Sequence, residues 1–225
     1  MTLLPLLAEA PHHAPSRSPS PPSSRALILG SSSPYRKTLL ERLRVPFTVE
    51  APDIDESPQA GEACNALALR LARAKASAIA ARFPEAVVIG SDQVADLDGE
   101  PLGKPGTHTR AVAQLQRMRG KTVVFQTAVA VVCQATGFQA SELAAVKVRF
   151  RSLTNEEIEN YLQAETPYDC AGSAKSEGLG ITLLASIESD DPTALIGLPL
   201  IRTSRLIAAA GIDLLGVRKI QEAQA

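Results

Sequence analysis

The sequence predicts a mixed α/β protein in which strands of one mixed sheet are interspersed with helices. Two observations support this class. Apolar runs of strand length are separated by helix-length segments with apolar residues at helical spacing, and their order follows no strict strand–helix–strand repeat. The 225-residue chain is 45 % hydrophobic and 21 % charged, a balance typical of a globular protein with a sizeable core.

The first elements are predicted from apolar runs and helix-start signals. Residues 26–30 (ALILG) form a continuous apolar run typical of a buried strand. Ser33 is a predicted helix N-cap, with Pro34 at the first helical position. A short strand at 47–50 and an acidic loop then precede an alanine-rich helix over 62–82.

The later elements follow from turn and capping signals. Asp98 and Gly99 predict a hairpin turn after the strand that begins at residue 86. Thr154 and Glu157 form a capping-box pattern, so a helix is expected there. The remaining predictions are a helix over 107–118, long strands at 121–133 and 138–150, a glycine-rich loop at 171–181, and a closing helix over 193–211.

The first 24 residues differ from the rest in composition. They hold six prolines and five serines, and their apolar patch is short, interrupted by Pro5 and without a basic flank. This pattern does not resemble a secretory signal. We expect residues 1–24 to be a disordered extension, or the product of an early start-codon assignment, and residues 25–225 to form one folded domain.

Charge and residue usage exclude several classes of function. The net charge of −1 argues against general binding to nucleic acid polymers, and no apolar run approaches the roughly 20 residues of a membrane span. Three widely spaced cysteines suggest reduced thiols in a cytoplasmic protein. His108 is the one histidine outside residues 1–24, so base chemistry is expected from carboxylates.

The stretch SSSPYRK, residues 31–37, is a candidate anion site. A helix N-terminus offers free N–H groups and a partial positive charge, and Ser31, Ser33, Arg36 and Lys37 add donors. Taken alone, the stretch equally describes an ordinary capped helix with a solvated basic face, which is the commoner case. It is not a Walker loop, because no GxxxxGK[ST] occurs.

Two groups of carboxylates are candidates for chemistry. Asp53, Asp55 and Glu56 lie together in an acidic loop and suit Mg²⁺, although a solvated acidic turn is the alternative. Asp92 follows an apolar strand directly, where a carboxylate is costly unless it is satisfied or used, so a functional role is favoured. We expect Gly90 to let a ligand approach the backbone beside it.

Three further segments carry isolated charges. Lys75 has apolar neighbours one turn away on either side, so its side chain either reaches past them to water or points into a cleft. Lys104 lies in the tight loop LGKPG. Glu177 belongs to the glycine-rich loop AGSAKSEGLG, which is either flexible or close to a ligand.

Together these stretches resemble the Maf family of nucleotide pyrophosphatases over roughly residues 26–210. The matching segments are LILGSSSPYRKTLLE, PDIDE, RLARAKA, IGSDQV, GKP, KVRFRSLTNEEIENYL, CAGSAKSEGLGI and IGLPL. No single segment is decisive, but their ordered set is highly specific. Gly30 departs from the pattern, since the family more often has alanine before the serines.

The resemblance implies a fold, a reaction and a set of site residues. The fold is an elongated mixed sheet with flanking helices in two lobes around a central cleft, as in the inosine triphosphate pyrophosphatases. The reaction is hydrolysis of a nucleoside triphosphate between the α and β phosphates, with Mg²⁺ or Mn²⁺. Asp92 matches the catalytic base, and Ser31, Arg36, Glu56, Lys75 and Lys104 match the family's other site positions. Glu56 is a candidate metal ligand, and Ser31, Arg36, Lys75 and Lys104, with Ser33 at the helix N-terminus, are predicted to bind the phosphates.

Three positions favour the branch of 7-methyl-GTP pyrophosphatases over the dTTP/UTP branch. This chain has Tyr35, Gln93 and Glu177 where the 7-methyl-GTP branch has an aromatic residue, glutamine and glutamate, and where the dTTP/UTP branch has arginine, threonine and glutamine. Methylation at N7 makes guanine cationic, so stacking on Tyr35 and hydrogen bonds to Glu177 are favourable. Alternatively, Tyr35 only packs the cleft wall, and Glu177 pairs with Lys175 or Lys37.

Other functions remain open from sequence. The chain could be a non-catalytic nucleotide-binding regulator of septum formation or cell division, a dTTP- or UTP-preferring enzyme, or an enzyme of broad tolerance. The presence of Asp92 and the cations argues against a binder without activity. A homodimer is expected only because the family often forms one.

Overall fold

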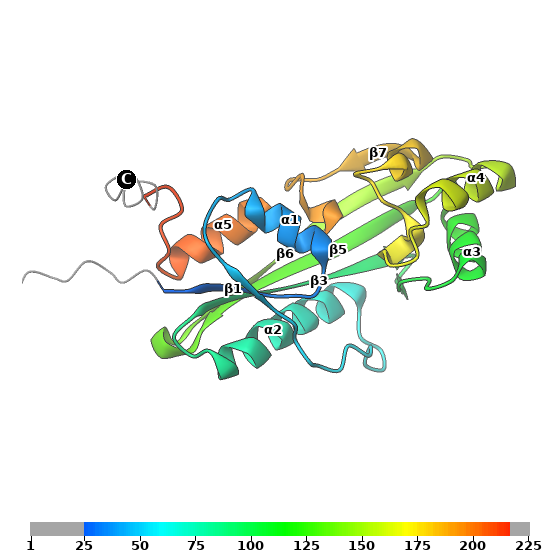
Figure 1. Cartoon of the computed structure of the whole chain (residues 1–225). Coiled ribbons are helices and arrows are strands. Elements are labelled where there is room, and N and C mark those ends of the chain that lie inside the picture. The colour runs from blue at the N-terminus through cyan, green and yellow to red at the C-terminus, as the bar shows by residue number, and fades with distance from the viewer. Residues whose placement is uncertain (1–24, 217–225) are drawn as a thin grey trace, which may run out of the picture.

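The computed structural model describes residues 25–216, where one seven-stranded mixed sheet is flanked by five α-helices (Figure 1). The strands are β1 (Leu27–Gly30), β2 (Thr48–Glu50), β3 (Val87–Leu97), β4 (Glu100–Leu102), β5 (Thr122–Cys133), β6 (Phe138–Phe150) and β7 (Leu184–Glu188). The α-helices are α1 (Pro34–Glu41), α2 (Cys64–Arg82), α3 (His108–Met118), α4 (Asn155–Glu165) and α5 (Leu200–Ala209). The short 3₁₀ turns are η1 (Gln134–Thr136), η2 (Ala171–Ser173), η3 (Leu179–Leu183) and η4 (Ala194–Ile196). The predicted extension at residues 1–24 lies outside the described residues.

The sheet is mixed, as the sequence predicts. Its strand order is β2-β1-β3-β5-β6-β7, and β4 pairs with β3 across the predicted hairpin. β1 runs parallel to both β2 and β3, whereas the β3–β5, β5–β6 and β6–β7 pairs are antiparallel. Asp98 and Gly99 both have positive φ, +57° and +89°, which is the backbone of a tight hairpin turn.

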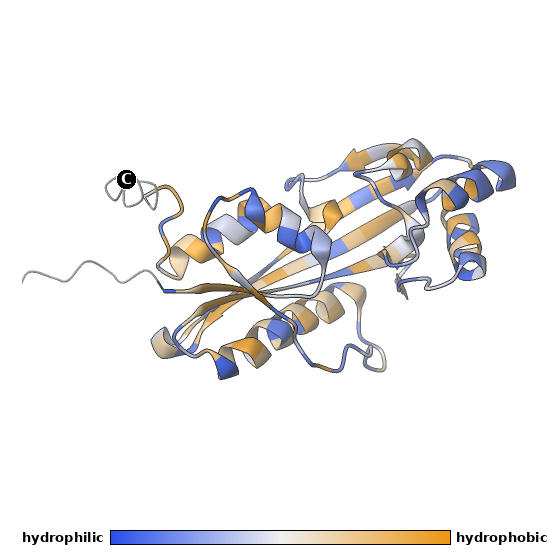
Figure 2. Cartoon of the chain, in the orientation of Figure 1, coloured by the Kyte–Doolittle hydropathy of each residue, from blue (hydrophilic) through white to orange (hydrophobic). Residues whose placement is uncertain are grey.

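Both faces of β1 and its neighbours are covered, which explains the continuous apolar run. Leu27 and Leu29 point toward α1 and α5, while Ile28 points toward α2 on the opposite face. Figure 1 shows α2 beneath the sheet with α1 and α5 above it, and Figure 2 shows the hydrophobic strands between them. The fold therefore buries a separate core on each side of this end of the sheet.

The other end of the sheet has its own core and helices. α3 and α4 pack at the far ends of β5 and β6, around buried Leu115, Phe150 and Leu162 (Figure 1). The predicted capping box begins α4: the Thr154 hydroxyl accepts from Glu157 N at 3.1 Å, and the Glu157 carboxylate accepts from Thr154 N at 2.7 Å. Two groups of helices thus cover the two ends of one elongated sheet, and the predicted fold class is confirmed.

Two local expectations differ from the structure. Gly90 does not open the backbone to a ligand, because the α2 backbone occupies that space: a Cβ there would lie 2.3 Å from Ala72 O. The closing helix begins only at Leu200, because Gly197 has φ +125° and Pro199 offers no N–H to a preceding helical turn. Within residues 25–216, no helix has both the length and the apolar character of a membrane span.

Candidate functional site

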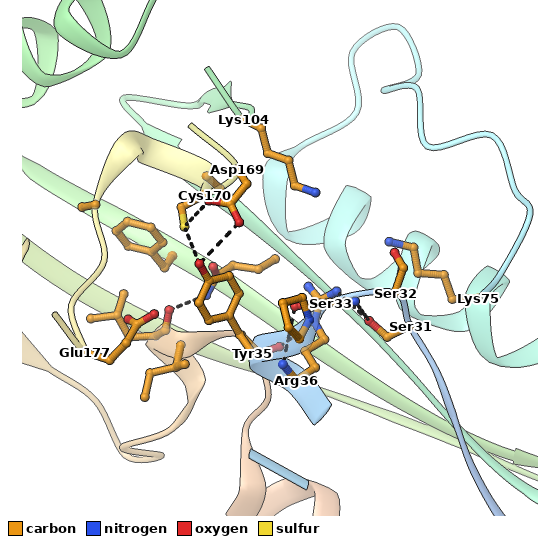
Figure 3. A pocket seen from close by; sticks show the side chains of 18 of the residues that line it. Ser31, Ser32, Ser33, Tyr35, Arg36, Lys75, Lys104, Asp169, Cys170 and Glu177 are labelled. Atoms are coloured by element: carbon orange, nitrogen blue, oxygen red, sulfur yellow. Dashed lines mark hydrogen bonds between the residues drawn. The ribbon is translucent and has the colours of Figure 1, made fainter. Parts of the chain in front are cut away.

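A cavity opens beside the N-terminus of α1 and holds most of the predicted site residues (Figure 3). The predicted residues that line it are Ser31, Ser33, Tyr35, Arg36, Glu56, Lys75, Gln93, Lys104 and Glu177. Asp92 is not in this lining; it lies behind Lys75 and is 7 % exposed. Segments from both ends of the sheet contribute, so the cavity is the cleft between the two groups of helices.

The serines shape the start of α1. Ser33 is its N-cap, and its hydroxyl accepts from Arg36 N at 3.4 Å. Buried Ser31 accepts from Ser33 N at 3.2 Å and from Arg36 Nη1 at 3.4 Å. The capped-helix interpretation is therefore correct, and it is compatible with an anion site, because the capped helix end faces the cavity.

Arg36 is fixed by the segment IGLPL, which packs in the same core as α1. Its Nε donates to Gly197 O at 2.9 Å, and the buried Ser91 hydroxyl lies 3.0 Å from the same carbonyl and 2.8 Å from Ala128 O. Burial lowers the pKa of the Arg36 guanidinium, and the charges of Asp92 and Glu56 oppose that shift. The guanidinium is therefore a positioned cation beside two carboxylates.

The loop that carries Gly197 is held by a buried acid. Asp191 has no exposed surface, and its carboxylate accepts from Thr193 Oγ1 at 3.1 Å and from Arg202 N at 3.2 Å. The Thr193 hydroxyl also lies 2.7 Å from Leu198 O. These bonds tie the segment IGLPL to the start of α5 and so keep Gly197 O in place.

Lys75 lies between two carboxylates, which the sequence did not reveal. Its Nζ lies 2.7 Å from Asp92 Oδ1 and 2.9 Å from Glu56 Oε1, and the lysine side chain is 6 % exposed. The close packing of α2 on Gly90 brings Lys75 to this distance. Asp92 Oδ2 has no hydrogen-bond partner among residues 25–216 and is not fully covered, so one carboxylate oxygen is left for another partner.

A second ion pair supports the loop that carries Glu56. Arg70 binds Glu62 through Nε at 2.6 Å and Nη2 at 2.8 Å, and Nη2 also donates to Ser57 O at 3.0 Å. The hydrogen bond from Arg70 lowers the pKa of Glu62 to about 2. The neighbouring acids Asp53 and Asp55 do not line the cavity, so Glu56 is the acid of this loop that faces it.

The carboxylates suit a divalent cation only in combination with a ligand. No group of three or more histidine, cysteine or acidic side chains in the described part of the chain could hold a metal by itself. Glu56 and Asp92 are nevertheless close together, because both pair with the ammonium group of Lys75. Mg²⁺ is commonly bound by one or two carboxylates plus phosphate oxygens and water. The donor set therefore fits a metal that arrives with a phosphate.

The three selectivity positions lie in the same cavity. Gln93 Nε2 lies within hydrogen-bond distance of three acceptors, Thr127 Oγ1, Ala194 O and Leu195 O, at 2.9, 2.9 and 3.0 Å, for its two donor hydrogens. Its Oε1 has no partner within residues 25–216 and is accessible. The Gln93 amide is therefore held in one orientation, and its Oε1 is available to accept a hydrogen bond from a ligand.

The proposed partners of Glu177 are engaged elsewhere. Lys175 pairs with Glu165 at 3.7 Å, and Lys37 pairs with Glu41 at 3.8 Å. No ion pair to Glu177 occurs within the described range, so the alternative in which a lysine neutralises it is wrong. Glu177 therefore brings an uncompensated charge to the cavity.

The glycine-rich loop packs against α4. Lys175 N donates to Tyr161 Oη at 3.1 Å and Leu179 N donates to Glu165 Oε2 at 3.0 Å, which fixes both ends of the segment on α4. A Cβ on Gly180 would lie 2.4 Å from Lys175 O, so the chain folds closely on itself here. This packing fixes the backbone from which Glu177 projects.

Lys104 enters the cleft from the loop after β4. It is exposed and has no ion pair within residues 25–216. Gly106 N donates to Tyr168 O at 3.0 Å, and His108 Nδ1 lies 2.9 Å from Tyr168 Oη. These contacts join the Lys104 loop to the segment after α4, which forms the neighbouring wall.

Sequence reasoning missed the wall formed by Asp169 and Cys170. The Tyr35 hydroxyl donates to Asp169 Oδ2 at 3.3 Å, and the Cys170 thiol lies 3.5 Å from Asp169 Oδ1 (Figure 3). Burial raises the pKa of Cys170 to about 12, so the thiol stays protonated. Cys170 begins the matching segment CAGSAKSEGLGI, but nothing in the sequence places it or Asp169 beside Tyr35, because Tyr35 and Asp169 are 134 positions apart in the chain.

The fold and cavity together describe an α/β protein with a cleft in which cations and a helix N-terminus stand beside carboxylates. The model of the family described as Maf-like protein matches residues 26–210, and this chain belongs to the Maf family. Among curated proteins, the 7-methyl-GTP pyrophosphatase of Albidiferax ferrireducens is 70 % identical over 197 residues, covering 88 % of this chain and 99 % of the relative. Those of Polaromonas sp. (70 %; 88 % and 90 % covered) and Burkholderia pseudomallei (60 %; 91 % and 94 % covered) carry the same name.

Proposed function

We propose that this protein is a nucleoside triphosphate pyrophosphatase that converts 7-methyl-GTP to 7-methyl-GMP and pyrophosphate. The 70 % identity to two 7-methyl-GTP pyrophosphatases over nearly their whole length supports the reaction. The observation that carries the proposal is that one cleft holds cations suited to a triphosphate together with an aromatic ring and acceptors suited to a base. Arg36, Lys75 and Lys104 supply cations for a triphosphate, and Tyr35, Gln93 and Glu177 supply an aromatic ring and acceptors for a base.

In the proposed mechanism, Asp92 is the general base that takes a proton from the attacking water. Lys75 holds Asp92 Oδ1 at 2.7 Å, which keeps the carboxylate in one orientation and leaves Oδ2 for the water. A base positioned in this way typically contributes about 10²–10⁴-fold to the rate. The proton leaves water as its oxygen attacks the phosphorus, and the bond to the pyrophosphate oxygen breaks.

The cations and the helix N-terminus serve the phosphates. Arg36 is preorganised by Gly197 O and Ser31, so little rearrangement is needed when it binds an oxygen. Lys75 and Lys104 oppose the negative charge that develops on the leaving pyrophosphate. Ser33 keeps the first turn of α1 in a conformation that presents its N–H groups.

A divalent cation is part of the proposal. Glu56, with Asp92 nearby, would hold Mg²⁺ or Mn²⁺ together with phosphate oxygens, and the bound ion would neutralise phosphate charge. We expect activity to require added metal and to be lost in chelator. A homodimer and a cytoplasmic location remain predictions, of which light scattering tests the first.

A panel of triphosphates tests the function. Purified protein with Mg²⁺ or Mn²⁺ is expected to release pyrophosphate fastest from 7-methyl-GTP, with GTP, dTTP and UTP as comparisons. Clear turnover of dTTP or UTP without turnover of 7-methyl-GTP would overturn the substrate. Tight nucleotide binding without turnover would instead support the non-catalytic regulator.

A further inference from the structure

The wall opposite α1 contains an acid that the proposed reaction has not used. Asp169 lines the same cavity as Tyr35, Gln93 and Glu177 and is exposed to it. No cation lies within 4 Å of its carboxylate among residues 25–216. The end of the cleft that holds Tyr35, Gln93, Asp169 and Glu177, here called the base end, therefore contains two acids that form no ion pair within residues 25–216. Lys104 lines the same cavity but lies beyond ion-pair distance of both.

Asp169 also holds the ring of Tyr35. The phenol donates to Asp169 Oδ2 at 3.3 Å, and the thiol of Cys170 approaches both the phenol oxygen at 3.9 Å and Asp169 Oδ1 at 3.5 Å. Figure 3 shows the Tyr35 ring directed from α1 toward these two residues. Burial raises the pKa of Tyr35, with further contributions from Cys170 and Asp169, so the phenol keeps the proton that it donates.

The two ends of the cleft consequently differ in charge. The other end of the cleft, here called the phosphate end, holds Lys75, Arg36, Asp92 and Glu56. Acids and cations are mixed there, because Lys75 pairs with both carboxylates and Arg36 lies near them. At the base end, Asp169 and Glu177 have no ion-pair partner among the described residues and line the cavity with the Tyr35 ring, while the unpaired cation Lys104 enters from the loop joined to the Asp169 segment. A ring with acids around it attracts a cationic heterocycle and offers less to a neutral base of the same shape.

We propose that Asp169 is a further specificity residue, which holds Tyr35 across the cleft and adds negative charge that favours a cationic purine. This inference rests on the proposed function. It assigns to Asp169 a share of the discrimination between 7-methyl-GTP and GTP, which have the same triphosphate and differ in the charge of the base.

Two substitutions separate the roles of Asp169. Asp169→Asn keeps an oxygen that can accept from Tyr35 but removes the charge, whereas Asp169→Ala removes both. The measured quantity is kcat/KM for 7-methyl-GTP divided by kcat/KM for GTP. Glu188→Gln is the matched control, because it removes an exposed acid of β7 outside the cleft.

We expect Asp169→Asn to lower this ratio by about 3- to 10-fold, the size expected of a partly desolvated charge interaction, chiefly through 7-methyl-GTP. Asp169→Ala is expected to lower it further, and Glu188→Gln to leave it unchanged. The Asp169→Asn effect should shrink in high salt, because screening weakens charge interactions at an exposed carboxylate.

The outcomes are distinguishable. A wild-type protein that does not prefer 7-methyl-GTP contradicts the proposed function, and the role of Asp169 with it. A wild-type preference that survives both substitutions overturns only the role of Asp169, as does an equal loss on both substrates, which indicates structural damage. Melting temperatures of the variants show whether the fold is retained.

Discussion

The two ends of the cleft are built in different ways. At the phosphate end, Ser31, Lys75 and Asp92 are buried, hydrogen-bonded to one another or to Arg36, and supplied by elements packed directly on β1 and β3. At the base end, Tyr35, Asp169 and Glu177 come from α1 and two loop segments and are more exposed. In the proposed reaction, the catalytic groups are therefore held by the core, whereas base selection is shared between Tyr35 and Gln93 on α1 and β3 and the loop residues Asp169 and Glu177, of which the loop residues can change with the least disturbance of the core.

The largest expected effect comes from removing the proposed base at the phosphate end of the cleft. Asp92→Asn should lower kcat by about 10²–10⁴-fold, because the amide cannot take the proton of water. The loss should be the same for every triphosphate, since the base end is untouched. Pyrophosphate release measures it.

Asp96→Asn is the matched control for this change. Asp96 lies four residues further along β3, where its carboxylate accepts from Gly99 N in the hairpin, and asparagine can retain that bond. Near-normal activity is expected. Full activity in Asp92→Asn would refute its assignment as the base.

Substitutions at two glycines test how closely α2 packs on the sheet beneath the phosphate end. Gly90→Ala places a Cβ 2.3 Å from Ala72 O and 2.5 Å from Ala76 N, so α2 must move away from β3. We expect a loss of about 1–3 kcal/mol in the free energy of unfolding, as for other overpacked sites. Activity should fall as well, because the shift withdraws Lys75 from Asp92.

Gly30→Ala is the comparison. Its Cβ would meet Ile89 O at 3.2 Å and Ile79 Cγ1 at 3.3 Å, contacts that small adjustments relieve. Thermal unfolding of the two variants gives the difference directly. Equal melting temperatures would show that α2 does not depend on the absence of a side chain at Gly90.

The base end is tested through the aromatic ring. Tyr35→Leu should lower kcat/KM for 7-methyl-GTP by about 2- to 30-fold, the range of cation–π interactions of roughly 0.5–2 kcal/mol, and should affect GTP less. Tyr35→Phe keeps the ring and should keep most of the preference. If leucine preserves the preference, Tyr35 only packs the wall.

The smallest effect concerns the loop that carries Glu56. The pKa of Glu62 is lowered to about 2 by Arg70, so the ion pair stabilises the folded state above about pH 4.5 and this contribution is lost as pH falls toward 2. Denaturant unfolding of wild type and Glu62→Gln should therefore differ at pH 6 and converge at low pH. A difference that does not narrow would contradict this pKa.

Local signals predicted most of the fold. The apolar run of β1, the cap at Ser33 and the capping box of α4 each act within a few residues, so the sequence displays them directly. The start of α5 was placed too early, because apolar spacing continues through the segment in which Gly197 and Pro199 prevent a helix.

The site was predictable only in part. Resemblance to the family gave the set of residues that the structure gathers around one cavity, but not their partners. The position of Lys75 between Glu56 and Asp92 depends on a loop, a helix and a strand meeting in space. Gly90 was misread for the same reason, since the sequence does not show which neighbour fills the space beside a glycine.

The most direct test of the central claim replaces only the three selectivity residues at the base end of the cleft. The triple variant Tyr35→Arg, Gln93→Thr, Glu177→Gln carries the residue types of the dTTP/UTP branch and leaves Asp92, Lys75 and Arg36 unchanged. We measure kcat/KM for 7-methyl-GTP and dTTP in wild type and variant. A shift of preference toward dTTP with activity retained is the predicted result, and an unchanged preference in an active variant would contradict the division of the cleft into a catalytic end and a base-reading end.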